Sequence, residues 1–501
     1  MHLMWKEKKS KIHGIGIIAS IDIKKNSKII QYIGDKISKK EGDKRSAERI
    51  RKYLSKKNEG SVYIFELNKK FDIDGSPLYN KARYINHSCD PNCEVDIIKN
   101  EIWIKSIKTI KKGEELSYDY GYPFDKEDYA DHECKCGSNK CIGYIISQDD
   151  WLKYKKYKKS FLKKKTTRKK KLIETILNKR KLGALKILCV GDIMLDHYVY
   201  GKVERISPEA PIPILTYESE NFQLGGAGNV ARNISDIGSK CILLGIIGND
   251  NASKKIIELV KKEKSIKSQL LSIKNFKTPI KTRYINESDH LLRVDEENVN
   301  FRLANNLIKK IKNIFLKHIK MCDLVIISDY NKCFLNKFLI KEFIQIAKDN
   351  NKLIIADPKK IDLSFYKNVD ILTPNQKEIS DSAGKKLTSE KNIIKYARKM
   401  IDKKNINEIL VTRSSRGMLL VGRDYIKNIK ANAKKVKDVT GAGDTVISIL
   451  GIMKAIGMET IDASTIANFA AGIIVGKSGT ASLSYNELIK NNDYRKILLN
   501  L

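Results

Sequence analysis

Residues 438–445, with the sequence Asp-Val-Thr-Gly-Ala-Gly-Asp-Thr, combine a carboxylate with closely spaced glycines. Gly441 and Gly443 allow backbone N–H groups to approach a ligand closely, and the apolar run that follows predicts a buried helix. A glycine turn that leads into a helix N-terminus is an anion site. Asp444 could therefore take a proton from a substrate hydroxyl while the N–H groups stabilise a transferring phosphoryl group. The segment predicts phosphotransfer, and a tight turn with a helix cap is the alternative interpretation.

A second group of reactive side chains is formed by cysteines, five of which lie in the first third of the chain. In a cytosolic protein, cysteines favour metal or thiol roles over disulfides. Cys134, Cys136 and Cys141 follow the spacing Cys-x-Cys-x4-Cys, and a closed tetrahedral Zn²⁺ site needs one more thiolate. Reduced cysteines without a metal are the alternative. The cysteines that lie among apolar segments are interpreted as core residues: Cys189, Cys241, Cys322 and Cys333.

The elements that position these groups belong to more than one domain. A chain of 501 residues is too long for one ordinary core, so we expect two or three domains. The sequence has no apolar N-terminal segment and no run of about 18 apolar residues, which predicts a cytoplasmic protein without a membrane helix. The formal net charge is +37, but Lys is abundant throughout, so compositional bias explains part of the excess.

The positive charge is densest at 153–181, where fifteen Lys or Arg residues stand against one acid, Glu174. Such a block cannot bury itself, so we interpret it as a solvated helix or a flexible connector. Aromatic residues such as Phe161 alternate with the charges, as in some single-stranded nucleic-acid contacts, so weak polyanion binding is the alternative. We therefore predict a first domain at 1–147, a basic linker at 148–184 and a second domain at 185–501.

The first domain is predicted to be compact and β-rich. Short apolar runs at 15–19, 29–33 and 63–67 are separated by glycine and polar turns, which is typical of short strands. Its polar motifs gather at 83–93 and 113–122.

These motifs resemble those of SET-domain protein lysine methyltransferases over about residues 10–147. The matching parts are a glycine segment at 12–17, Asn-His-Ser-Cys at 86–89, Glu-Glu-Leu-Ser-Tyr-Asp-Tyr at 114–120, and the cysteines at 134–141, which resemble a zinc-binding post-SET segment. The resemblance implies methyl transfer from S-adenosyl-L-methionine to a lysine of a protein substrate, with Tyr120 as the catalytic tyrosine. In this reaction the protein mainly positions and desolvates the reactants. The cofactor-binding positions that the resemblance implies are Gly14, Gly16, Tyr63, Arg83, Asn86 and His87.

The same resemblance makes further predictions at single positions. It nominates Cys89 as the fourth zinc ligand, with Cys93 as the substitute. Tyr118 occupies a position where the family has Phe or Tyr, and a hydroxyl there fills space and holds a water, so we expect a bias to monomethylation. Tyr79 replaces the glycine that the family has before Asn80, so we expect altered loop geometry there.

Beyond residue 184 the pattern changes to that of a doubly wound parallel α/β sheet. Continuous apolar strands alternate with helix-length periodic segments, which is typical of buried parallel strands. Ligands of such sheets bind at the carboxyl ends of the strands. The predicted strands are 186–191, 241–247, 324–328, 353–357, 370–373 and 409–412.

This region, 185 to about 490, resembles the ribokinase-like (PfkB-type) carbohydrate kinases. The resemblance rests on Gly-Gly-Ala-Gly-Asn at 225–229, Asn-Gln-Lys-Glu at 375–378 and Gly-Ala-Gly-Asp at 441–444. Arg-Ile-Ser-Pro-Glu-Ala-Pro at 205–211 narrows it to the D-glycero-β-D-manno-heptose-7-phosphate kinases. It implies phosphorylation of that sugar phosphate to the 1,7-bisphosphate with ATP and Mg²⁺.

Roles follow for individual residues from the same resemblance. Asp444 is the base that deprotonates the sugar hydroxyl, and the anion hole is formed by the N–H groups of Gly441, Ala442 and Gly443. The implied ATP and Mg²⁺ positions are Asn375, Glu378, Thr412, Gly417 and Asn468, and the implied sugar-binding positions are Asp196, Gly225, Gly226 and Asn229.

Two features of this region concern loops and assembly. Strand-like pieces at 208–223 and 278–295 interrupt the α/β pattern, and in the family such inserts form a lid that mediates dimerisation, so we expect a homodimer. Asn331 and Cys333 stand where the heptose branch usually has glycine, so we expect that loop to be altered.

Three hypotheses follow. The first is a sugar-phosphate kinase fused to a lysine methyltransferase. The second is primarily a methyltransferase, whose kinase domain acts on another sugar or binds a ligand, and the third is a pair of non-catalytic scaffolds. Retention of Asp444 and Tyr120 favours the first hypothesis.

Overall fold

The computed structural model describes residues 3–56, 63–287, 289–297, 301–433, 436–477 and 479–500. The chain divides into two compact units, Met1–Thr166 and Thr167–Leu501, and the division falls within helix α2 (Trp151–Ile176). Among the described helices, none combines the length and apolar character that crossing a bilayer requires.

The first unit is built from small sheets, as its short apolar runs predict. Strands β3 (Lys28–Tyr32), β9 (Glu101–Ser106) and β8 (Cys93–Ile98) form one sheet, and β4 (Asp35–Ser38), β6 (Phe71–Asp74) and β5 (Ile64–Glu66) form another. Strands β1 (Trp5–Lys9) and β2 (Ile15–Ala19) pair as a hairpin, and α1 (Lys39–Lys56) follows β4. The core of this unit contains Ile17, Ile102, Ile104 and Leu116.

Two very short strands bring remote motifs of the first unit together. Strand β7 (Asn86–His87) pairs in parallel with β10 (Ser117–Tyr118), with Asn86 opposite Ser117 and His87 opposite Tyr118. The pairing is reinforced at Asn92, whose side-chain amide donates to the carbonyl of Glu115 over 2.8 Å. The two polar segments expected to hold the chemistry therefore lie side by side.

Two of the three aromatic residues of the basic segment, Tyr154 and Tyr157, have a packing role. The segment begins as α2, and Tyr154 is 3% exposed in a cluster with Phe124 and Ile146. The ring of Tyr157 lies 5.3 Å from that of Phe124. Phe161 remains 52% exposed.

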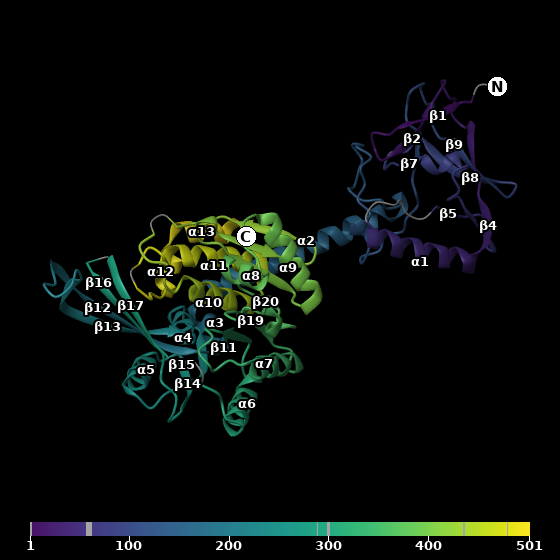
Figure 1. The fold of residues 1–501 in the computed structure, drawn as a ribbon. Helices are drawn as coiled ribbons and strands as arrows, with labels where there is room; N and C mark the ends of the chain where they lie inside the picture. Colours follow the sequence, from purple (N-terminus) through teal and green to yellow (C-terminus); the bar gives the residue numbers. More distant parts are fainter. Residues whose placement is uncertain are drawn as a thin grey trace. The chain divides into compact units, whose positions relative to one another are not determined.

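The second unit has a nine-stranded sheet (Figure 1). Its strands from β15 to β21 are parallel. Six of them were predicted from the sequence, whereas β15 was not. The last two strands are antiparallel additions at one edge. The sheet is therefore mixed. In spatial order the strands are β15 (Ile266–Ser272), β14 (Lys240–Ile247), β11 (Lys186–Gly191), β18 (Leu324–Ser328), β19 (Leu353–Asp357), β20 (Ile371–Leu372), β21 (Glu408–Thr412), β22 (Met418–Val421) and β23 (Ile426–Ile429).

Helices cover both faces of this sheet because the strands are apolar on both sides. In β11, Ile187 and Cys189 point into one core, whereas Leu188 and Val190 point into the other. The first core includes residues of α3 (Lys179–Ala184), α4 (Ala227–Asp236), α5 (Asn251–Lys262), α10 (Ala442–Ala455), α11 (Thr460–Ile474), α12 (Tyr485–Lys490) and α13 (Asn492–Asn500). The second includes residues of α6 (Asn305–Ile319), α7 (Lys337–Asp349), α8 (Gln376–Ser382) and α9 (Glu390–Lys404).

A separate four-stranded sheet forms the predicted lid, at the left of Figure 1. Its order is β13 (Pro213–Gly226), β12 (Ile193–Ile206), β16 (Ile280–Asn286) and β17 (Asp289–Glu296). It is larger than the predicted inserts, because β12 continues the chain almost directly from β11 for fourteen residues. The strand that leaves the central sheet thus becomes part of the lid.

Candidate active sites

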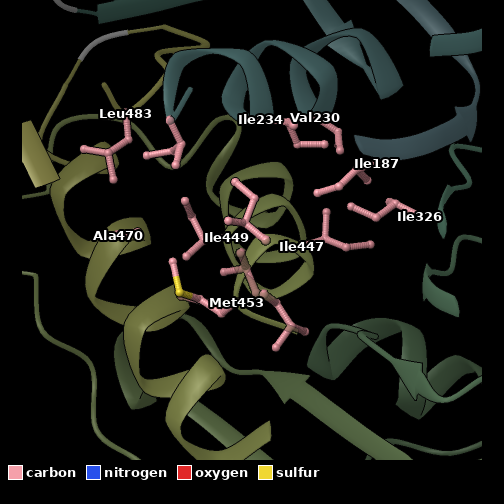
Figure 2. Packing of buried hydrophobic residues seen from close by; sticks show 14 of the residues in the cluster. Ile187, Val230, Ile234, Ile326, Ile447, Ile449, Met453, Ala470 and Leu483 are labelled. Carbon is pink, nitrogen blue, oxygen red and sulfur yellow. The ribbon is translucent and has the colours of Figure 1, made fainter. Parts of the chain in front are cut away.

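Helix α10 places the glycine segment of the second unit. Its side chains Ile447, Ile449 and Met453 are fully buried, and Figure 2 shows them packed among Val230 of α4 and Ile326 of β18. Burial of all sides of the helix fixes the position of its N-terminus. The turn before it requires a left-handed backbone, since Gly441 has a φ of 77°.

Asp444 lies in the first turn of α10 and is 3% exposed. Its Oδ2 accepts a hydrogen bond from the side-chain amide of Asn229 over 2.8 Å, and its Oδ1 accepts one from the Tyr330 hydroxyl over 2.6 Å. Burial raises the pKa of Asp444 to about 6, although both hydrogen bonds act to lower it. A carboxylate with a pKa near neutrality can accept a proton under ordinary conditions.

The space beside Asp444 suits an anion. Among the described residues, the backbone N–H groups of Gly441 and Gly443 have no hydrogen-bond acceptor. A Cβ added at Gly443 would meet no heavy atom within 4 Å. These donors at a helix N-terminus are therefore available to a phosphoryl group.

The expected sugar-binding residues lie at the junction of the lid and the central sheet. Asp196 of β12 is buried, and its Oδ1 accepts from Nη1 of Arg283 over 2.7 Å while its Oδ2 accepts from the Thr480 hydroxyl over 2.9 Å. Two positions of β13 must be glycine, because neighbouring atoms leave no room for a side chain there. A Cβ at Gly225 would lie 2.6 Å from Asp196 Oδ2, and one at Gly226 would lie 2.4 Å from the Asp192 carbonyl oxygen.

Among the positions expected to bind the nucleotide, Asn375 and Glu378 form a capping box at α8. The Glu378 N–H donates to Asn375 Oδ1 over 2.9 Å, and the Asn375 N–H donates to Glu378 Oε2 over 2.8 Å. Lys359 donates to Glu378 Oε1 over 2.7 Å. Asp357, at the end of β19, has its pKa raised by burial and by the charge of Glu378. Oxygen donors of this kind suit Mg²⁺, so the residues present fit that ion.

The remaining expected nucleotide positions have structural partners. The Thr412 N–H donates to the Pro374 carbonyl over 3.0 Å, and the Asn468 side-chain amide donates to the Lys430 carbonyl over 2.8 Å. Gly417 has a φ of 75°, and a Cβ there would lie 2.0 Å from the Ile429 carbonyl oxygen. These contacts connect the end of β21, the end of β23 and helix α11. In the structure, Thr412, Gly417 and Asn468 therefore hold neighbouring backbone segments together.

In the first unit, Asn86 connects three of the expected motifs. Its side-chain amide donates to Ser10 Oγ over 3.0 Å, to the His13 carbonyl over 3.1 Å and to Glu115 Oε1 over 2.9 Å. A Cβ at Gly16 would lie 2.5 Å from the same Glu115 oxygen. The glycine segment is therefore held against the β7 and β10 pair. Gly14, with a φ of 54°, faces open space.

The expected catalytic tyrosine lies in a row of aromatic rings. The Tyr120 hydroxyl donates to the Ile85 carbonyl over 3.0 Å, and its N–H donates to His87 Nδ1 over 3.2 Å. The ring of Tyr118 is 5.0 Å from that of Tyr120. Arg83 lies over the ring of Tyr63, with 4.3 Å between the guanidinium carbon and the ring centroid. Burial raises the pKa of Tyr120 and of Tyr118, so both phenols stay protonated.

Four cysteines converge in the same unit. The sulfur atoms of Cys89, Cys134, Cys136 and Cys141 all lie within 4.8 Å of one another. The Cys89 Sγ is 3.8 Å from both Cys134 Sγ and Cys141 Sγ. Zn–S bonds of about 2.3 Å in a tetrahedron separate the sulfurs by about 3.8 Å, so this donor set fits Zn²⁺. Cys93 lies in the core instead, 3.5 Å from Asn92 Oδ1.

Three residues of the second site were not identified from the sequence. Tyr330 lies two residues after the end of a predicted strand, at Ser328, which is a usable signal because such positions line ligand sites. Arg283 and Thr480 reach Asp196 from the lid and from a late loop, and their local sequence gives no comparable signal.

A doubly wound sheet, a β lid and a buried aspartate behind a glycine turn define a sugar kinase of the ribokinase type. The model of the family "pfkB family carbohydrate kinase" matches residues 184–487, and the SET domain model matches residues 14–121. The chain therefore belongs to the pfkB family of carbohydrate kinases, and it carries a SET domain ahead of the kinase domain.

Curated relatives match the kinase part. The bifunctional protein HldE of Paramagnetospirillum magneticum is 40% identical over 313 residues, which are 62% of this chain and 63% of the relative. The protein of the same name from Helicobacter pylori is 39% identical over 315 residues, which are 62% of this chain and 68% of the relative. The chain thus spans about 63% of the length of the first of these relatives.

Solved structures share the fold of the second unit. Phosphofructokinase-2 from Escherichia coli in complex with potassium has a TM-score of 0.53 at 19% identity and covers 63% of this chain and 98% of its own. Ribokinase from Arabidopsis thaliana complexed with ribose and ATP has a TM-score of 0.50 at 18% identity, with coverage of 63% and 98%.

Proposed function

We propose that the second unit phosphorylates a sugar phosphate with ATP, and that the acceptor is D-glycero-β-D-manno-heptose 7-phosphate, converted to the 1,7-bisphosphate. The observation that carries this proposal is the buried Asp444 carboxylate beside the N–H groups of Gly441 and Gly443 at the start of α10. The choice of acceptor is supported by the motif at 205–211 and by the relatives named HldE.

The proposed reaction is an in-line displacement. Asp444 takes the proton of the acceptor hydroxyl, whose oxygen forms a bond to the γ-phosphorus as the bond to the bridging oxygen breaks and ADP leaves. The N–H groups of Gly441 and Gly443 stabilise the charge on the transferring group. The Ala442 N–H, which was expected to join them, donates to the Val439 carbonyl over 3.3 Å and has to leave that bond to take part. Bound Mg²⁺ would neutralise the nucleotide phosphates, held by oxygens of Asn375, Glu378 and their neighbours. Asp196, Gly225, Gly226 and Asn229 are proposed to hold the sugar.

The test is ATP-dependent phosphorylation by the purified full chain with Mg²⁺. The heptose 7-phosphate is compared with ribose and fructose 6-phosphate, and the product is identified by phosphorus NMR. We expect a kcat/KM for the heptose phosphate at least about 100-fold above the others, since a site built for several hydroxyls rejects acceptors that leave its polar groups unpaired. Turnover on another sugar alone would overturn the acceptor, and no turnover at all would overturn the kinase proposal.

We also propose that the first unit is an S-adenosyl-L-methionine-dependent protein lysine methyltransferase. The observation that favours it is the arrangement of Tyr120, His87 and Asn86 around the parallel pair of β7 and β10. Tyr120 would position the lysine amine and the methyl group, while the row of rings excludes water. A methyltransferase whose kinase unit serves another sugar or only binds a ligand remains the second candidate.

Tyr118 gives a prediction about the methylation product. Its ring is buried between Tyr120 and Phe65, at 5.0 Å and 5.8 Å. The wild type should give mainly monomethyl-lysine on a pool of lysine-bearing peptides, and Tyr118→Phe should give di- and trimethyl-lysine, because removal of the hydroxyl makes room for a methylated amine. Mass spectrometry of the peptides measures this. Tyr144→Phe, in a different aromatic cluster of the unit, should keep the wild-type product. Trimethyl-lysine from the wild type would refute the assignment.

A homodimer through the lid is the proposed assembly. The lid exposes apolar side chains, with Tyr217 60%, Ile206 60% and Leu292 58% exposed. We propose that these side chains pack against the lid of a second copy of the chain. Leu292→Asp should convert a dimer to a monomer, measured by light scattering during size-exclusion chromatography. Phe338→Asp, on α7 and 53% exposed, is the matched control and should remain dimeric. A monomeric wild type would contradict this assembly.

A further inference from the structure

Tyr330 belongs to a loop that the fold holds firmly. The Asp192 carboxylate, 1% exposed, accepts hydrogen bonds from the N–H groups of Tyr330 over 2.8 Å and Lys332 over 3.1 Å. Asp329 is equally buried and accepts one from the N–H of Asn331 over 2.7 Å. Two buried carboxylates therefore fix the backbone from the tyrosine to Lys332.

The loop keeps a glycine-like backbone without glycine. Asn331 and Cys333 have φ values of 57° and 73°, which is the left-handed region. Asn adopts this conformation at little cost, whereas Cys does so less readily. The departures from the family pattern at these two positions therefore leave a tight turn in place, and the turn directs Tyr330 to Asp444.

We propose that Tyr330 is a positioning residue for the base of the phosphotransfer reaction, through the 2.6 Å hydrogen bond from its hydroxyl to Asp444 Oδ1. Asn229 holds Oδ2 from the other side over 2.8 Å. Two donors on two oxygens fix the plane of the carboxylate, and each oxygen keeps a lone pair for the acceptor hydroxyl. This inference rests on the proposed kinase function.

The hydrogen bond also acts on the charge of the base. A donor to a carboxylate favours its ionised form, and burial works against that form. The phenol itself stays protonated, because burial and the neighbouring Asp444 raise the pKa of Tyr330. Asp444 acts as a base only when ionised, so activity is lost as the pH falls through its pKa. Loss of the Tyr330 donor raises that pKa and moves the acid limb of the pH profile to higher pH.

The experiment is the pH dependence of kcat/KM for the full chain with ATP, Mg²⁺ and the heptose 7-phosphate. The wild type should lose activity below a pH of about 6. In Tyr330→Phe the acid limb should move up by about one pH unit, the size expected for one hydrogen bond to a charged group. Activity should recover substantially at about pH 9, where the carboxylate is ionised in both proteins.

Tyr366→Phe is the matched control. Its hydroxyl donates to another buried carboxylate, Asp329 Oδ2, over 2.5 Å, and has no hydrogen bond to Asp444. Its acid limb should keep the wild-type position. A uniform loss of rate in Tyr330→Phe with an unmoved limb would overturn the inference and leave only a structural role.

A second variant covers the case in which Tyr330→Phe does not fold. Incorporation of 3-fluorotyrosine at position 330 keeps the shape of the side chain and makes it a stronger donor, so the acid limb should move to lower pH, and an unmoved limb would overturn the inference. A wild type that phosphorylates no sugar would remove the proposed function and this inference together, whereas an active wild type with unmoved limbs removes the inference alone.

Discussion

Asp444→Asn should lower kcat for phosphotransfer by at least about 10²–10⁴-fold, the range for loss of a general base. A carboxamide cannot take the proton of the acceptor hydroxyl. The melting temperature should change by only a few degrees, because two effects oppose each other. Burial raises the pKa of Asp444, so the ionised carboxylate costs stability above the unfolded pKa, and the neutral amide removes that cost. The amide then presents a donor toward Asn229 or Tyr330, which both donate to Asp444.

The measurement compares steady-state phosphorylation of the heptose 7-phosphate with thermal unfolding of the same samples. Asp370→Asn is the matched control, since Asp370 is 7% exposed and accepts hydrogen bonds from Lys348 over 2.6 Å and Asn407 over 2.9 Å. It directly precedes β20, at the amino end of that strand. This variant should lose stability while its kcat stays within about threefold of the wild type, because it touches no part of the proposed site. Wild-type turnover by Asp444→Asn would remove Asp444 as the base.

Cys141→Ser should reduce the zinc that copurifies from one equivalent to none and lower methyl transfer by about 100-fold or more, the upper range for disruption of a metal site. The four cysteine sulfurs at this site come from Cys89 and from the segment 134–141, which follows His132 of the aromatic row. In that row, Tyr122 stacks on His132 with 5.5 Å between ring centroids and lies 6.3 Å from Tyr120. Structural zinc contributes folding energy directly, so its loss should release this segment from Tyr120.

Elemental analysis and methylation of lysine-bearing peptides measure the two effects. Phosphotransfer by the same protein should be unchanged, which separates loss of one unit from general unfolding. Cys93→Ser is the matched control, because Cys93 is 1% exposed but lies in the core beside Asn92. This variant should keep its zinc. Folded wild-type protein without zinc would exclude the metal site. Loss of zinc in Cys93→Ser would identify Cys93, in place of Cys89, as the fourth ligand.

Much of the fold follows from local pattern. Strands β11, β18 and β19 coincide with the apolar runs 186–191, 324–328 and 353–357, because buried parallel strands are continuous apolar segments. The antiparallel edge strands β22 and β23 were not predicted. Their sequences are short apolar runs near turns, and a short run does not reveal the direction in which it pairs.

The sequence by itself also determined which residue types could act. Gly441, Gly443 and Asp444 are adjacent in the chain, so their chemistry is visible without a structure. The capping box of Asn375 and Glu378 is equally local, and its spacing is readable as a helix start. Such features depend on bonds between neighbouring residues, which the order of amino acids fixes directly.

Only the tertiary structure decided which remote groups meet. Tyr330 and Asp444 are 114 positions apart, and Thr480 reaches Asp196 over 284 positions. Cys89 and Cys93 are close in sequence, yet the fold brings only Cys89 to the other three thiols. The spacing of apolar residues predicts which face of a strand or helix is buried. The element that packs against that face depends on how crossovers and loops arrange the chain. That arrangement is a property of the whole packed chain, and no local segment encodes it.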